Sequence, residues 1–162
     1  MDAMDLALRV CESVAFCIHC AIGLSEPCHG IGRALVRDSL PLPNLFFPAA
    51  GAALAAVAAA NFAGGPAAVL AAQAYVAAFH AGGVYAHWRV GHHPVAGVGP
   101  GFFVVLAFAV MALRIGAPAA LLLAAASVGA GVLLGAVLVR RGGWRPSAVR
   151  EDSVHMPLRS SA

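Results

Sequence analysis

Five apolar runs dominate the chain, and all but the fourth, which is short, are close to the length that a helix needs to cross a membrane. They cover residues 6–24, 45–62, 67–88, 101–113 and 118–139. A bilayer core of about 30 Å is spanned by roughly 20 helical residues. Because 61% of the residues are hydrophobic and only 10% are charged, the composition also lies outside that of soluble globular domains. We therefore predict an all-α membrane protein, a bundle of about five transmembrane helices within residues 1–141, followed by a flexible polar tail at 142–162.

The connections between these runs differ in length. Residues 25–44, between the first two runs, are long enough for a short helix at the membrane interface. The fourth and fifth runs are separated only by "RIGAP", in which Arg114 brings a charge, Gly116 favours a helix end and Pro118 favours a helix start. We expect a tight hairpin there. The alternative is one long kinked helix, which would place Arg114 near the bilayer centre at a cost of about 3 kcal/mol.

The arginines predict an orientation. With the N-terminus outside and the C-terminus in the cytoplasm, eight of the ten arginines fall on the cytoplasmic side, as the positive-inside rule requires. These eight are Arg33, Arg37, Arg89, Arg140, Arg141, Arg145, Arg150 and Arg159. Only Arg9 and Arg114 fall on the opposite side. Because the arginines form no single basic face, we expect the lipid bilayer, and no nucleic acid, as a partner.

Two polar stripes interrupt the apolar runs. Gln73, His80 and His87 are seven residues apart and fall within about 40° of one another on the third helix. Glu12 and His19 form a similar stripe on the first. Ionisable side chains facing lipid are costly, so both stripes should point inward, toward each other. The candidates for a polar interior or a ligand site, including those near the cytoplasmic interface, are Glu12, His19, Gln73, His80, Tyr85, His87 and Arg89.

These stripes allow three interpretations. They can be buried hydrogen-bonding pairs that fix helix register. They can form a proton path or a quinone-type head-group site, since imidazole exchanges protons near neutral pH. A metal site is the third, but His92 and His93 are adjacent and two further ligands would have to come from elsewhere. We predict no metal site and no catalytic residue, and a quinone is the cofactor that the second interpretation implies.

Two cysteines form a C-x-x-C pair, "CIHC", in the first helix. Such a pair cycles between thiol and disulfide where its surroundings stabilise the thiolate. Cys17 and Cys20 instead lie toward the C-terminal half of an apolar helix, the unfavourable end of its dipole. We therefore expect them to serve as small buried packing residues. A zinc site that adds Cys28 and His29 would lack a second compact ligand pair.

Small residues mark the faces by which the helices should pack. Ser127, Gly131 and Gly135 recur at a spacing of four in the fifth helix, and such a ridge allows helices to approach closely in lipid. It can dock within the bundle or against another membrane protein subunit. A weaker pattern of the same kind, Gly51, Ala55 and Ala59, lies in the second helix.

The third and fourth helices resemble a segment of DoxX-like membrane proteins. The segment is "AGGVYAHWRVGHHPVAGVGPGFFVVLAFAVMALR", and the earlier "FFPAAGAALAAVAAANF" is similar to that family's second helix. The positions that match the family signature are Gly83, Tyr85, His87, Arg89 and Gly91. Two positions depart from it, because His92 stands where an acidic residue is usual and Glu26 lies near the position of a usual lysine.

This resemblance implies a four-helix core, to which the fifth helix is added at the C-terminus. In bacteria and archaea such proteins are associated with quinone-linked or thiol-redox membrane complexes, and some animal relatives are assembly factors. We therefore expect a non-catalytic subunit or assembly factor of a membrane complex. The alternative is a redox-linked membrane protein that binds a quinone-type ligand in its polar interior.

Overall fold

The computed structural model describes residues 3–29, 42 and 45–141, and this part of the chain is all-helical. Its elements are α1 (Ala3–His29), α3 (Phe46–Ala63), α4 (Pro66–Arg89), the 3-10 turn η1 (Pro94–Gly97), α5 (Val98–Ile115) and α6 (Ala117–Arg141). The described residues contain five segments that are long and apolar enough to cross a membrane. The protein is therefore an integral, multi-pass membrane protein built as a helical bundle, as its apolar runs predict.

Two of the helices extend beyond the runs that predict them. The fourth span, including η1, covers Pro94–Ile115, which makes it long enough to cross a bilayer on its own. The first helix continues to His29 through Pro27, although proline commonly ends a helix. Most of the connection expected to hold an interfacial helix, residues 30–41 and 43–44 of 25–44, lies outside the described residues, as does the expected flexible tail, 142–162.

The connection between α5 and α6 is a tight hairpin, as "RIGAP" predicts. α5 ends at Ile115, α6 begins at Ala117, and Gly116 between them has φ 79° and ψ 151°. This region of the backbone map is essentially restricted to glycine. Two antiparallel spans result, and the alternative of one long kinked helix is excluded.

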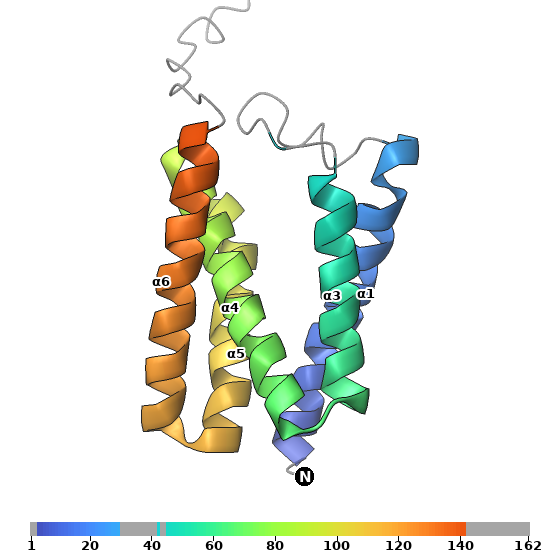
Figure 1. Cartoon of the computed structure of the whole chain (residues 1–162), viewed down its shortest axis with the longest axis vertical. Coiled ribbons are helices and arrows are strands. Elements are labelled where there is room, and N and C mark those ends of the chain that lie inside the picture. Colours follow the sequence, from blue (N-terminus) through green and yellow to red (C-terminus); the bar gives the residue numbers. More distant parts are fainter. Residues whose placement is uncertain (1–2, 30–41, 43–44, 142–162) are drawn as a thin grey trace, which may run out of the picture.

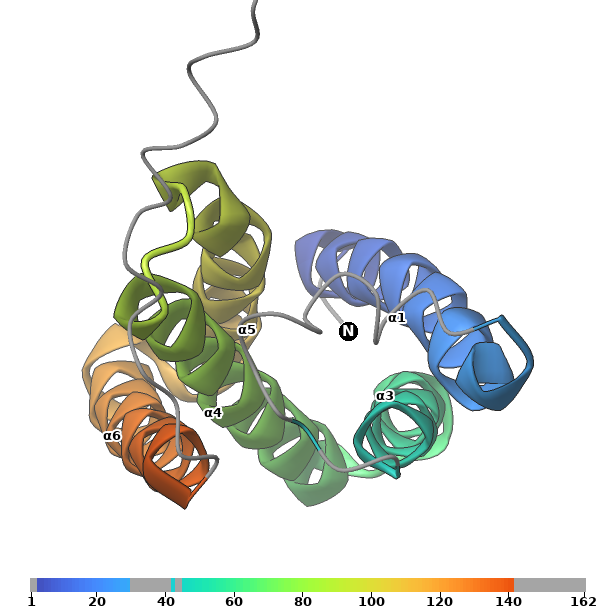
Figure 2. The same ribbon diagram turned by 90° about the horizontal axis from the view of Figure 1, so that it is seen from above.

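The helices run alternately up and down, so that the N-terminus and the end of α6 lie at opposite ends of the bundle (Figure 1). Contacts between α1 and α3, α3 and α4, α4 and α5, and α5 and α1 close a ring of four helices. α6 lies outside this ring, against α4 and α5 (Figure 2). The arrangement is a four-helix core with one added C-terminal helix.

The small-residue ridge of α6 packs inside the molecule. Ser127, Gly131 and Gly135 are all buried. A Cβ atom on Gly131 would overlap the backbone of Ala78 in α4, and one on Gly135 would lie 3.0 Å from the carbonyl oxygen of Gly82. In lipid, where apolar burial does not drive helix association, such close approach supplies van der Waals contact. The ridge therefore holds α6 against α4.

A similar close approach joins α1 to α3. A Cβ atom on Gly23 would lie 2.7 Å from the carbonyl oxygen of Phe47 and 3.1 Å from the Cα of Gly51. Of the pattern expected in this helix, Gly51 is buried at the contact, whereas Ala55 is half-buried and Ala59 is exposed. The contact with α1 therefore depends on the glycine.

Candidate functional site

The polar stripes of α1 and α4 meet in the middle of the four-helix ring. The Nε2 atom of Gln73 donates to Oε2 of Glu12 at 2.7 Å, and neither side chain is exposed. The two residues come from helices that run in the same direction, so the next members of both stripes, His19 and His80, follow on the same side along the bundle. The inward orientation of Glu12 and Gln73 agrees with the cost of exposing polar groups to lipid.

A third helix completes this layer through Asn61 of α3. The Nδ2 atom of Asn61 donates to Oε2 of Glu12 at 2.8 Å and to the hydroxyl of Ser13 at 3.1 Å. Its Oδ1 atom accepts from Nε2 of Gln73 at 3.1 Å. All four side chains are at most 3% exposed. Three helices are thus tied together by side-chain hydrogen bonds, which are scarce and specific within a membrane.

The layer nearer the N-terminus is ionic and is centred on Asp5. The Nε and Nη2 atoms of Arg114 donate to its two carboxylate oxygens, each at 2.8 Å, in a bidentate arrangement. Nη2 of Arg9 lies 2.9 Å from Oδ2, and Nη1 of Arg9 donates to the backbone carbonyl of Asn61. Arg9 and Arg114 are the two arginines that the predicted orientation leaves on the side poor in arginine. Both guanidinium groups share one carboxylate, Asp5, which is only 3% exposed.

His80 lies in an aromatic layer on the other side of the Glu12 layer. Its ring is stacked on Phe16, with centroids 5.6 Å apart and planes at 12°, and it also contacts Phe103 at 4.8 Å and Phe79 at 5.2 Å. Its Nδ1 atom is 2.9 Å from the carbonyl oxygen of Val76. Because a carbonyl oxygen can only accept, Nδ1 carries the proton in this bond. In the neutral ring Nε2 is therefore an acceptor.

His19 belongs to the same layer but is exposed. Its ring meets the edge of Phe103 at 6.1 Å, and Phe103 in turn contacts His80. The two histidines thus contact the same phenylalanine. We call His19, His80, Phe16 and Phe103 the histidine–phenylalanine cluster.

The remaining candidates lie nearer the end of α4. His87 is half-buried, and its Nδ1 atom shares a hydrogen bond of 2.7 Å with Nδ1 of His92, just beyond the turn at Gly91. Arg89 is exposed. Tyr85 packs edge-on to Trp88, with centroids 6.1 Å apart. None of these side chains makes a described contact with Glu12 or with the histidine–phenylalanine cluster.

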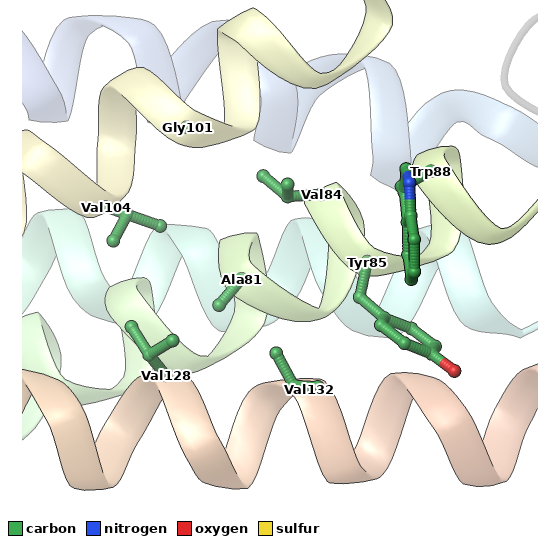
Figure 3. Close-up of a pocket in the computed structure, with 8 residues that line it drawn as sticks. All are labelled: Ala81, Val84, Tyr85, Trp88, Gly101, Val104, Val128 and Val132. Atoms are coloured by element: carbon green, nitrogen blue, oxygen red, sulfur yellow. The ribbon is translucent and has the colours of Figure 1, made fainter. Parts of the chain in front are cut away.

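Tyr85 lines a separate apolar groove of about 420 Å³ between α4, α5 and α6. The lining residues are Ala81, Val84, Tyr85, Trp88, Gly101, Val104, Val128 and Val132. Figure 3 shows the phenol oxygen of Tyr85 pointing away from the valine side chains. The groove therefore offers apolar side chains and few polar groups.

The cysteines are less buried than their small size predicts. Cys11, Cys17 and Cys28 are exposed, and Cys20 is half-buried. The expectation of buried packing is therefore wrong for Cys17, because Phe16, and not the neighbouring thiol, occupies the inward face of α1 at this level. In the part of the chain that the structure describes, the cysteines form no disulfide, and no three His, Cys, Asp or Glu side chains are grouped as a metal site requires.

Asp5, Ser13 and Asn61 belong to the polar layers but were missed by the sequence interpretation, although Asp5 and Asn61 leave a signal. Asp5 precedes Glu12 by seven residues and so continues the stripe of α1. Asn61 is the only polar side chain in α3, and a lone amide in an otherwise apolar span indicates a buried partner.

Comparison with models of protein families, with curated proteins and with solved structures finds no match for this chain.

Proposed function

We propose that this membrane protein binds a quinone-type ligand, a flat lipid-soluble ring with hydrogen-bonding oxygens, at the histidine–phenylalanine cluster. The observation that carries the proposal is the state of His80. Its ring is held between phenylalanines and is 7% exposed, and the proton on Nδ1 leaves Nε2 as the acceptor of the neutral ring. An acceptor held among aromatic rings suits the hydroxyl group of a quinol.

The surroundings of His80 support the same ligand class. Phe16 and Phe103, both buried, surround the His80 ring with aromatic groups, and His19 adds a second, exposed imidazole beside Phe103. A quinone ring needs both features, because aromatic stacking holds the ring and hydrogen bonds fix its oxygens. The resemblance to DoxX-like proteins, with their quinone-linked complexes, favours the proposal further. In the orientation that the arginines favour, the cluster lies on the cytoplasmic side of the Glu12 layer.

Ligand-dependent stabilisation of the purified full chain tests the proposal. A short-chain ubiquinol or menaquinol at about 100 times its Kd should stabilise the folded protein by about 2.7 kcal/mol. His80→Phe keeps an aromatic ring in the stack but removes Nε2, so it should abolish the shift. His93→Phe, at an exposed position outside the cluster, is the matched control and should keep it. An equal shift in His80→Phe and the wild type, or no shift in either, would refute the proposal.

A second candidate function is that of a subunit or assembly factor in a membrane complex. The buried ridge at Gly131 is occupied by α4, but α6 carries another small-residue pair, Ala125 and Gly129, on its exposed face. No atom lies within 4 Å of the position that a Cβ on Gly129 would take. Such a face allows a helix of another protein to approach closely.

Gly129→Leu tests this second function, because a larger side chain there leaves the internal contacts of α6 intact. Cross-linking at native expression should lose a partner band in Gly129→Leu and keep it in Ala130→Leu, at a neighbouring exposed position. A wild-type chain that migrates alone would exclude the subunit role.

A further inference from the structure

Glu12 and Gln73 each keep one buried oxygen without a hydrogen bond. These atoms are Oε1 of Glu12 and Oε1 of Gln73, and both side chains are completely buried. The two groups are already joined, because Nε2 of Gln73 donates to Oε2 of Glu12. A buried acceptor without a donor destabilises the folded state, because the atom has lost its bonds to water and gained none in return. A single proton placed between these two atoms would give both of them a hydrogen bond.

The orientation of both amides is fixed by their partners. Turning the amide of Gln73 over would place its oxygen against Oε2 of Glu12 and Oδ1 of Asn61, which are both acceptors. Turning Asn61 over would likewise set its oxygen against Oε2 of Glu12. The free atom of Gln73 is therefore its oxygen, and it requires a donor.

The carboxyl group of Glu12 is asymmetric in its hydrogen bonds. Oε2 accepts two, from Gln73 and Asn61, whereas Oε1 accepts none. An ionised carboxylate spreads its charge over both oxygens and needs donors at each. A protonated carboxyl group has one carbonyl oxygen that accepts and one hydroxyl that donates, and two bonds accepted at Oε2 with none at Oε1 fit this asymmetry.

We infer that Glu12 is a proton-binding site within the membrane, in which the proton sits on Oε1 and is donated to Oε1 of Gln73. Carboxyl and amide then form a cyclic pair with two hydrogen bonds, and both buried oxygens are satisfied. The ligand is a proton, bound and released by one carboxyl group. The site lies in a different layer from the histidine–phenylalanine cluster and does not depend on a quinone.

The neighbouring charges fit a neutral Glu12. On α1, Asp5 accepts the guanidinium donors of Arg9 and of Arg114 from α5, so this carboxylate is the ionised partner of the arginines. The groups that bond Glu12 itself, Asn61 from α3 and Gln73 from α4, are neutral amides. Ser13 lies beside them, and His80 begins the next layer of α4. A neutral carboxyl avoids the cost of a second ionised group deep in the bundle.

Infrared spectroscopy of the full chain in lipid vesicles tests this inference directly. Glutamate labelled with carbon-13 at its side-chain carboxyl should reveal the carbonyl band of a protonated acid at neutral pH, shifted from its unlabelled position. The chain has three glutamates, Glu12, Glu26 and Glu151. The band should disappear in Glu12→Gln and persist in Glu26→Gln, whose side chain is also buried in the wild type. Absence of the band would mean an ionised Glu12 and would overturn the proposal.

Stability supplies a second readout that does not depend on the band. Glutamine at position 12 can donate to Gln73 Oε1 and accept from Gln73 Nε2, so Glu12→Gln should unfold at the wild-type temperature. Glu12→Leu keeps a side chain of similar bulk but cannot form hydrogen bonds with Gln73, so it should unfold at a lower temperature than the wild type. A wild-type unfolding temperature that rises with sodium but not with choline would show a cation in place of the proton, and would also overturn the proposal.

Discussion

Gly131→Ala is the substitution that most sharply tests how α6 is held to the four-helix core. The added Cβ would lie 2.6 Å from the carbonyl carbon of Ala78 and 2.9 Å from its Cα, whereas ordinary contact begins at 3.4 Å. The carbonyl oxygen of Ala78 lies nearer still, so the helices must separate by more than about 0.8 Å at this point, the difference between 3.4 and 2.6 Å. The obstructing atoms are backbone and cannot rotate away, so we expect a cost of about 2–3 kcal/mol.

Gly129→Ala is its matched control, since it lies on the same helix with open space around the new Cβ. Both substitutions gain about 0.5–1 kcal/mol from the higher helix propensity of alanine, and this gain cancels in the comparison. Gly131→Ala should therefore unfold about 2–3 kcal/mol more easily than Gly129→Ala, measured by titration with SDS in mixed micelles while helicity is followed. Coincident unfolding curves for the two variants would refute the packing of α6 described above.

Three further tests, each on a different part of the structure, use the same unfolding assay. Asp5→Asn removes the carboxylate that two guanidinium groups share and should cost about 3 kcal/mol or more of stability. Arg114→Gln should cost less, because the Arg114 side chain is 18% exposed. Equal losses of stability in the two variants would contradict the ionic layer around Asp5. Gly116→Ala should cost about 1–3 kcal/mol of stability because Gly116 has a positive φ. Gly101→Ala, inside α5, is the control, and a loss in Gly116→Ala no larger than in this control would contradict the hairpin geometry. Cys17→Val, at an exposed position, should change stability by less than about 0.5 kcal/mol, and a loss above about 2 kcal/mol would show that the thiol packs inside.

The sequence predicts the spans well, because length and apolarity are local properties that the bilayer selects directly. It also predicts that Glu12 and Gln73 share an interior, because a spacing of seven keeps residues on one helix face. The hairpin at Gly116 follows from turn chemistry in the same way. In each case the relevant information lies within one short segment.

Relations between helices were harder to predict. The ridge at Gly131 could have served an internal or an external contact, and only the placement of α4 decides between them. Arg9 and Arg114 fall on the side poor in arginine in the predicted orientation, and their meeting on Asp5 depends on residues 109 positions apart. His19 and His80 have equivalent places in their stripes, but one is exposed and the other buried. Periodicity predicts which side chains share a helix face, whereas the burial of that face depends on the neighbouring helix that covers it.

Native mass spectrometry of the full chain released from its own membrane tests most directly whether the histidine–phenylalanine cluster holds a quinone, as we propose. We expect a species with the mass of the chain plus one isoprenoid quinone, absent from His80→Phe and present in His93→Phe. A wild-type chain that carries only phospholipid, or no ligand, would contradict it.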